Sequence, residues 1–120
     1  MNVMWYAGKF DEASWNFLAQ IGITPSYLRQ SERGMAAVQQ TFHYKRELLA
    51  GDIVEVQSRV LKVGEKSIRF QHEMLNAETG ETAAICEIIG VHLDRRLRKA
   101  RPFTAEIKSA AARMFEQQAA

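Results

Sequence analysis

The first two dozen residues carry a hydrophobic pattern with the period of an α-helix. Apolar side chains recur every three or four positions and therefore share one helical face: Phe10, Ala13, Phe17 and Ile21. Polar side chains recur on the opposite face: Lys9, Glu12, Asn16 and Gln20. This arrangement predicts an amphipathic helix within residues 1–24.

Residues at both ends of this segment and on its flanks refine the prediction. Asn2 is suited to cap the helix, because its side-chain oxygen can accept a hydrogen bond from a free backbone N–H group. Gly22 can adopt the left-handed conformation that ends a helix. Trp5, Tyr6 and Trp15 widen the apolar side well beyond a narrow stripe, so we expect other structure to wrap around this helix.

In the middle of the chain the hydrophobic period changes to two. Three segments, at 53–60, 68–74 and 82–93, alternate in this way and are separated by short turns. Strands joined by such short turns must pair antiparallel, so the three predict a meander. The third segment is apolar on both sides, and we expect it to be a central strand with both faces buried. Its small residues, Ala84 and Gly90, would let a helix approach closely.

The remaining segments complete an α+β chain. Thr24 and Pro25 predict the cap and first residue of a short helix, followed by a loop at 30–34. Residues 35–47 predict a strand, because their aromatic side chains favour the extended conformation. A final helix from about Thr104 is predicted by an apolar stripe: Ile107, Ala110, Ala111 and Met114.

Composition limits the classes of protein to which the chain can belong. With 120 residues it suits one domain with one hydrophobic core. No apolar run has the roughly 20 residues needed to cross a bilayer, and the first residues lack the pattern of a signal peptide. Cys86 is the only cysteine, which excludes internal disulfides, and we expect a cytoplasmic protein. The net charge of +2 favours neither nucleic acid nor membrane as a partner.

Short motifs along the chain resemble those of one known family. Asn2 is followed four residues later by Tyr6, and then by the acidic-acidic-alanine step of residues 11–13. Tyr44 precedes a turn containing Gly-Asp and an alternating strand. In order and spacing, these motifs are similar to those of hot-dog-fold thioesterases of the 4-hydroxybenzoyl-CoA thioesterase type.

This resemblance implies an acyl-CoA thioesterase, which hydrolyses a thioester to a carboxylate and free coenzyme A without a metal or a redox cofactor. It also implies a curved antiparallel sheet around the long helix, and a homodimer or homotetramer with active sites between subunits. The family's catalytic aspartate lies in an Asp-x-x-Gly-His loop after a first strand. This sequence begins one residue after the position of that histidine, so we expect Met1 to be an internal residue of a longer protein.

The candidate catalytic residues are Asn2, Tyr6, Asp11 and Glu12. Thioester hydrolysis needs a group that attacks or activates water, and donors for the developing oxyanion. Free N–H groups at the helix start, around Asn2 and Tyr6, are suited to that oxyanion, but Asn2 could equally be a simple cap. Asp11 and Glu12 are the nearest carboxylates. Asp11 is the better candidate for lining a cleft, because Glu12 pairs with Lys9 on a solvated face.

A basic segment provides the candidate residues for binding coenzyme A: Arg95, Arg96, Arg98 and Lys99. Arginine at a strand end suits the 3′-phosphate and the pyrophosphate of that molecule. A solvated loop and a nonspecific phosphate-binding patch are the alternative interpretations. The three histidines lie on separate strands without the spacing of metal ligands. We expect His72 and His92 to be hydrogen-bonded core residues and Cys86 to be an inert buried thiol.

Two functions from different classes therefore remain. The first is an acyl-CoA thioesterase. The second is a non-catalytic hot-dog module that binds acyl-CoA or serves as an assembly unit, and the lack of an Asp-x-x-Gly-His motif in the sequence favours it.

Overall fold

The computed structural model describes residues 3–49 and 51–119, so Asn2, the predicted helix cap, lies outside the described residues. The elements follow in the order α1 (Val3–Gln20), α2 (Pro25–Ser31), β1 (Arg33–Tyr44), β2 (Val54–Val63), β3 (Ser67–Asn76), β4 (Thr82–Asp94), β5 (Lys99–Ala100) and α3 (Ala105–Ala119). The predicted α+β class and the order of elements are confirmed.

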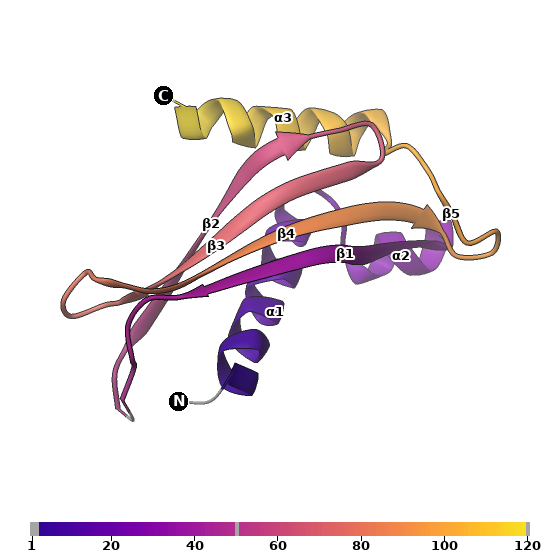
Figure 1. Ribbon diagram of the computed structural model, residues 1–120. Helices are drawn as coiled ribbons and strands as arrows, with labels where there is room; N and C mark the ends of the chain where they lie inside the picture. The colour runs from indigo at the N-terminus through magenta and orange to yellow at the C-terminus, as the bar shows by residue number, and fades with distance from the viewer. Residues whose placement is uncertain (1–2, 50, 120) are drawn as a thin grey trace.

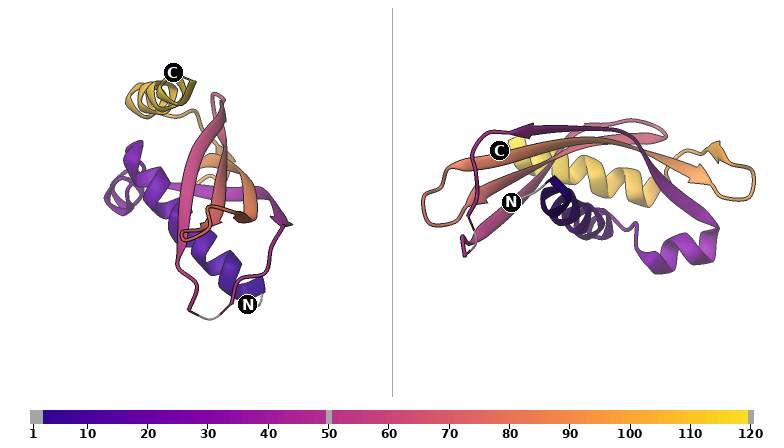
Figure 2. Two further views of the ribbon diagram at one scale, coloured as in Figure 1. Left: turned by 90° about the vertical axis from the view of Figure 1, so that its left-hand side faces the viewer. Right: turned by 60° about the horizontal axis from the view of Figure 1, so that its bottom comes forward.

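The strands form one antiparallel sheet with the order β1-β4-β3-β2, and the short β5 pairs with β4 (Figure 1). Strands β2, β3 and β4 are the predicted meander, and β4 is the predicted central strand. The sheet bends over the helices, as the resemblance implied (Figure 2). Strands β1 and β2 are the two long edges of this sheet.

The apolar face of α1 packs against the sheet as predicted. Phe10, Phe17 and Ile21 are each no more than 2% exposed. Gly22 adopts a φ of +96° and ends the helix, and the next N–H group donates back to the Leu18 carbonyl at 2.9 Å. Trp15 is 46% exposed, so the sheet covers the helix on one side and does not wrap it completely.

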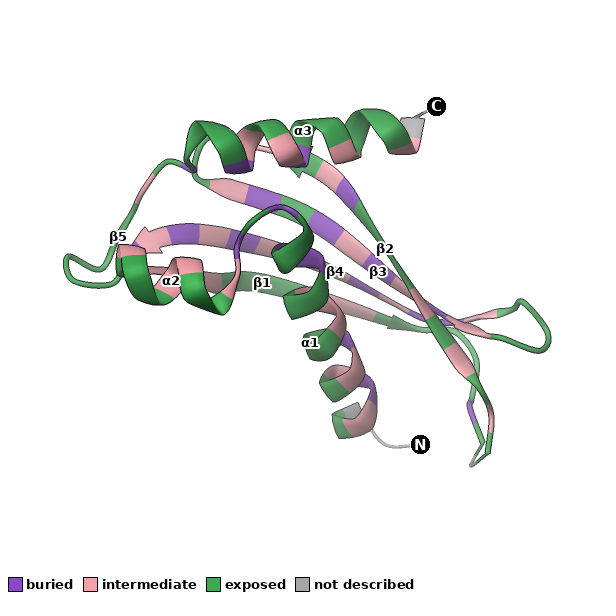
Figure 3. Cartoon of the chain, turned by 180° about the vertical axis from the view of Figure 1, so that it is seen from behind, coloured by how far each residue is buried: buried purple, intermediate pink, exposed green. Residues whose placement is uncertain are grey.

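The two faces of β4 differ, which corrects the prediction that both are buried. Residues on the helix side are buried, whereas those on the other side are half-buried (Figure 3). The helices lie on one side of the sheet only. The space at Gly90 is also not used by a helix: a Cβ atom there would meet Met35 Cε at 3.1 Å and Phe70 Cε1 at 3.8 Å. These neighbours come from the adjacent strands.

Helix α2 is longer than expected, and the loop after it is shorter. Thr24 Oγ1 accepts a hydrogen bond from the Tyr27 N–H group at 3.1 Å, as predicted for the cap. The helix ends at Ser31, because Glu32 adopts a left-handed φ of 54° and donates its N–H group to the Leu28 carbonyl. Strand β1 therefore begins at Arg33, and the predicted loop at 30–34 does not form.

Helix α3 packs beside β2 and covers part of its edge. Ile107 and Ala111 of the predicted stripe are buried. The Gln118 side chain accepts from the Val60 N–H group at 2.8 Å and donates to the Val60 carbonyl at 2.9 Å. A side-chain amide thus replaces a neighbouring strand at one point of the edge. None of the described helices is long and apolar enough to cross a membrane.

Candidate active site

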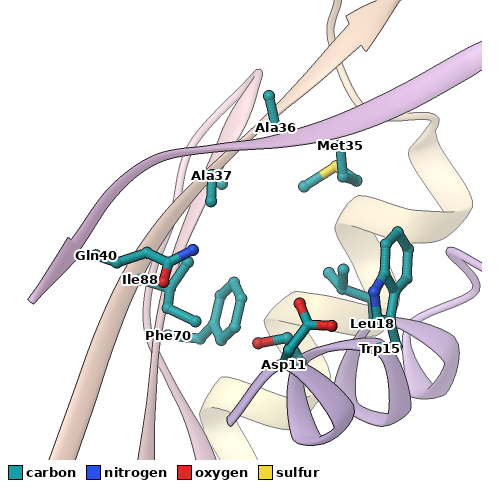
Figure 4. Close-up of a pocket in the computed structure, with 11 residues that line it drawn as sticks. Asp11, Trp15, Leu18, Met35, Ala36, Ala37, Gln40, Phe70 and Ile88 are labelled. Carbon is teal, nitrogen blue, oxygen red and sulfur yellow. The ribbon is translucent and has the colours of Figure 1, made fainter. Parts of the chain in front are cut away.

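A cavity of about 220 Å³ lies between α1 and the β1 half of the sheet (Figure 4). We call it the β1-side cavity. The helix and the three strands contribute its lining residues: Asp11, Ser14, Trp15 and Leu18 from α1, Met35, Ala36, Ala37 and Gln40 from β1, Phe70 from β3, and Ile88 and Gly90 from β4. The strand walls are mostly apolar, with Gln40 as their polar side chain, and the helix contributes Asp11 and Ser14.

Asp11 is the one carboxylate among the described residues that line this cavity. Ser14 and Trp15 follow it by three and four residues, and that spacing puts all three on one face of α1. The Asp11 carboxylate points from the helix toward the cavity (Figure 4). Asp11 thus lines a cavity, as the sequence interpretation allowed, and its catalytic role stays a prediction.

Glu12 lies on the other side of α1, where a groove of about 410 Å³ opens toward β2. We call this the β2-side groove; its lining residues are Lys9, Glu12, Ala13, Asn16, Phe17, Gln20, Val54, Val56 and Ser58. Glu12 Oε2 is 3.6 Å from Lys9 Nζ, and both side chains are exposed. The solvated ion pair is therefore present, and the structure separates Glu12 from Asp11.

A buried histidine connects the cavity and the groove beneath the helix. His72 Nε2 is 2.9 Å from Ser14 Oγ, and its Nδ1 is 2.7 Å from Ser58 Oγ. The Ser14 hydroxyl donates to the Phe10 carbonyl at 3.0 Å, so we assign the His72 proton to Nε2, and Nδ1 accepts from Ser58. Burial lowers the pKa of His72 from 6.5 to about 4. The imidazole is therefore neutral at pH 7.

His92 is a second satisfied core histidine. Its Nδ1–H group donates to the Arg101 carbonyl at 2.9 Å, which leaves Nε2 to accept from the Tyr27 hydroxyl at 2.9 Å. Cys86 is fully buried, and burial, together with the charge of Glu87, raises the pKa of its thiol to about 11. His72 and His92 are hydrogen-bonded core residues and Cys86 is buried, as predicted. Among the described residues, no cluster of His, Cys, Asp or Glu side chains could hold a metal ion.

Tyr6 is not brought to the cavity. It is 5% exposed and packs edge-to-face against Tyr44, with ring centroids 5.1 Å apart. Its side chain is therefore part of the core near the start of α1. Asn2 lies outside the described residues, so its predicted role at the helix start stays a prediction.

The basic residues lie in the β4–β5 hairpin (Figure 1): Arg95, Arg96 and Arg98 are in the turn, and Lys99 is the first residue of β5. They are exposed, and none of them lines the β1-side cavity. Asp94 organises the hairpin: its Oδ1 accepts from the N–H groups of Leu97 and Arg96, and its Oδ2 lies 3.0 Å from Arg33. The hydrogen bond from Leu97, followed by that from Arg96 and by nearby arginine charges, lowers the pKa of Asp94.

Apart from Gly90, which was expected to let a helix approach, the strand residues that form the cavity walls were not predicted from the sequence. Periodicity predicts which residues of a regular strand face the helix, but β1 has a bulge between Ala37 and Gln39 that shifts the register against β4. Ala36 and Ala37, although adjacent, both line the cavity. The signal that could have found part of the wall is the helical spacing of Ser14 and Trp15 from Asp11.

Comparison with known proteins identifies the family and the fold of the chain. The family model of the thioesterase-like superfamily matches residues 1–111. The chain belongs to this superfamily. No curated protein sequence matches the chain.

Solved structures resemble this thioesterase-like chain over nearly its full length. The protein SAV2348 from Staphylococcus aureus, solved in complex with CoA, has a TM-score of 0.92 at 16% identity, covering 97% of this chain and 73% of that chain. The BH1999 gentisyl-coenzyme A thioesterase has a TM-score of 0.79 at 23% identity, covering 93% and 86%. A thioesterase from Thermus thermophilus, complexed with coenzyme A and zinc, has a TM-score of 0.79 at 22% identity, covering 97% and 81%. At these identities the likeness shows the fold, which is the hot-dog fold.

Proposed function

We propose that this protein is an acyl-CoA thioesterase that binds the acyl group in the β1-side cavity. The observation that carries the proposal is one carboxylate, Asp11, in the wall of a mostly apolar cavity. Membership of the thioesterase-like superfamily supports the reaction. The two structural neighbours solved with coenzyme A support a coenzyme A thioester as the substrate.

In the proposed reaction Asp11 acts as the general base. It accepts a proton from a water molecule whose oxygen adds to the thioester carbonyl carbon. The carbon–sulfur bond then breaks, and the departing thiolate takes the proton, which gives a carboxylic acid and free coenzyme A. The Gln40 amide, also in the cavity wall, is suited to donate a hydrogen bond to the developing oxyanion.

The helix geometry changes one part of the interpretation based on sequence. Eight residues separate Val3 from Asp11, which corresponds to roughly 12 Å along the axis. Because Val3 is this far from Asp11, we propose that a role for the helix start, around Asn2 and Tyr6, in binding the oxyanion involves a second subunit.

Replacement of Asp11 tests the proposal, and its neighbour provides a matched control. We expect Asp11→Asn to lower kcat/KM for a panel of acyl-CoA thioesters by roughly 10²–10⁴-fold, the usual contribution of a general base. Glu12→Gln removes the adjacent carboxylate from the other side of the helix and should leave the rate unchanged. Free thiol release measures both, and full activity in Asp11→Asn would refute the role of Asp11.

The second candidate function is a non-catalytic module that binds acyl-CoA or serves as an assembly unit. This candidate follows from the same resemblance, whose catalytic Asp-x-x-Gly-His motif is not found within residues 1–120. Calorimetric titration with acyl-CoA separates the two: binding without hydrolysis by the unmodified chain supports the module and contradicts the enzyme.

We propose that the basic hairpin binds the phosphates of coenzyme A. The side chains of Arg95, Arg96, Arg98 and Lys99 are exposed and carry charges suited to them. The combined change Arg96→Ala and Lys99→Ala should raise KM for an acyl-CoA but not for the matching acyl-pantetheine, which has neither the 3′-phosphate nor the pyrophosphate. Arg113→Ala on α3 is the control, and equal effects on both substrates would contradict the proposal.

We propose that the protein is cytoplasmic. Its single cysteine is buried and free, as is usual in a reducing compartment.

We also propose that the chain forms a homodimer or a dimer of dimers. The exposed edge of β1 and the half-buried outer face of β4 are the surfaces that support this assembly. Sedimentation at low micromolar concentration should show no monomer. A monomer there would contradict the proposed assembly.

A further inference from the structure

In one wall of the β1-side cavity, the side chain of Met35 lies over Gly90. A Cβ atom on Gly90 would lie 3.1 Å from Met35 Cε and 3.8 Å from Phe70 Cε1. The first distance is too short for an unstrained contact between carbon atoms, whereas the second is ordinary. The Met35 methyl group therefore uses the space that any side chain at residue 90 would need. All three residues line the cavity.

Met35 is the wall residue that can most readily change position. A methionine side chain is unbranched and has three rotatable bonds, so it adapts to the space around it. Met35 also belongs to an edge strand and is only partly buried. Phe70, by contrast, is stacked on Phe17 with ring centroids 4.7 Å apart, and Ile88 is 5% exposed on the central strand. These two form fixed parts of the wall.

The size of the cavity makes this contact matter for ligand choice. A closed apolar cavity of about 150 Å³ holds a benzene molecule, and the β1-side cavity has about 220 Å³. It therefore has room for a group of benzene size with a small extension. For groups near this limit, the few atoms of the Met35 side chain decide whether the group fits.

We propose that Met35, seated over Gly90, determines the largest acyl group that the cavity accepts. Removing the methionine side chain enlarges the cavity. Adding a methyl group at residue 90 displaces the Met35 tip, which it would meet at 3.1 Å, into the cavity and leaves less space there. The proposal rests on the acyl-CoA thioesterase function given above and names a specificity-determining residue for it.

The test compares acyl-chain preference in four proteins. For the unmodified chain, Met35→Ala, Gly90→Ala and the double variant, kcat/KM is measured for straight-chain acyl-CoAs of increasing length and for benzoyl-CoA. Met35→Ala should raise kcat/KM for acyl groups just beyond the normal limit by roughly 10-fold or more, the discrimination typical of one methylene group in a hydrophobic pocket. Gly90→Ala should move the limit toward shorter groups.

The double variant shows whether the effect of Gly90→Ala depends on the Met35 side chain. When Met35 is already alanine, the atom that a Cβ at residue 90 would meet at 3.1 Å is absent. The Gly90→Ala change should then have little further effect on acyl preference, so the two substitutions are non-additive. Val38→Ala is the control, because Val38 is on the same strand, 61% exposed and outside the cavity.

A binding measurement separates failure of this inference from failure of the proposed function. Non-hydrolysable acyl-CoA thioethers of the same lengths are titrated while the fluorescence of Trp15, at the cavity, is followed. Hydrolysis with the same length limit in all variants overturns the role of Met35 but not the thioesterase. No hydrolysis in any protein overturns the thioesterase, and the thioether series then still decides on Met35. Circular dichroism shows whether Gly90→Ala is folded. If it is not, the length limit is compared between Met35→Ala and Met35→Leu, whose side chain is shorter and branched.

Discussion

The two openings beside α1 differ in the features that make a binding site. The β2-side groove is the larger, at about 410 Å³, but the exposed Lys9–Glu12 pair lies in its wall. The β1-side cavity has about 220 Å³, three strands in its wall and one carboxylate. One residue step along a helix turns the side chain by about 100°, so Asp11 and Glu12 belong to different openings. Wall chemistry, rather than volume, identifies the candidate site.

A thin partition separates the two openings under the helix. Phe70 lines the cavity, Phe17 lines the groove, and their rings are stacked on each other. His72 crosses the same partition through its bonds to Ser14 and Ser58. Substitutions in this partition should therefore reduce stability more than substitutions at the exposed rim of the groove.

Removal of the Phe17 ring should have the largest effect on stability. Phe17 is 2% exposed, and Phe17→Ala should lower the free energy of unfolding by roughly 3–5 kcal/mol, the usual cost of emptying an aromatic core position. Urea unfolding measures the change, with the exposed Asn16→Ala as control. A loss below about 1 kcal/mol, the range of surface substitutions, would mean that the ring does not form a partition.

Acid should destabilise the protein through His72. Between pH 6.5 and 4 the unfolded chain protonates this histidine, whereas the folded protein, with the pKa lowered to about 4, does not. Stability is therefore full above pH 6.5 and falls as the pH drops to 4, by roughly 3 kcal/mol in total at 1.36 kcal/mol per pKa unit. Urea unfolding from pH 7 to 4.5 should show a smaller decrease in His72→Gln. An equal decrease in the free energy of unfolding of both proteins would contradict the lowered pKa of His72.

Loss of the Gln118 amide should have a moderate effect on stability, at the edge of β2. Gln118→Ala removes two hydrogen bonds to Val60, each with a net contribution of about 1 kcal/mol, so we expect a loss of about 1–2 kcal/mol. The exposed Gln117→Ala is the control. Hydrogen exchange of the Val60 amide should accelerate only in Gln118→Ala. Unchanged exchange would show that the contact is not formed in solution.

Loss of the exposed ion pair on the groove should have the smallest effect. Glu12→Gln removes the partner of Lys9 at 3.6 Å, and exposed pairs of this kind contribute less than about 0.5 kcal/mol on a helix. The free energy of unfolding should change by no more than this amount, and by less in high salt. A change above roughly 1 kcal/mol, beyond the range of exposed pairs, would mean that the groove rim is less solvated than its exposure indicates.

Local patterns made the elements predictable, whereas the cavity walls depend on contacts between distant segments. The 3.6-residue period identified Phe10 and Phe17 as core residues, and the two-residue period identified the meander. Met35 and Gly90 are 55 residues apart, and they meet only because β1 pairs with β4 around a bulge. Neither the bulge nor the pairing has a local signal in the sequence. The central strand was wrongly predicted to be buried on both faces, because apolar residues on an outer face do not reveal what covers them.

The contact between Gln118 and Val60 also bears on aggregation. An unpaired sheet edge can recruit strands from other molecules and start an ordered aggregate. By bonding both backbone groups of Val60, the last turn of α3 interrupts the edge of β2 near its middle. A chain shortened after Met114 would lose the contact between Gln118 and Val60 while keeping the buried residues of α3. We expect this shorter chain to fold less stably, because it lacks the two hydrogen bonds to Val60, and also to form fibrils sooner, so the last turn of α3 acts against aggregation as well as for stability.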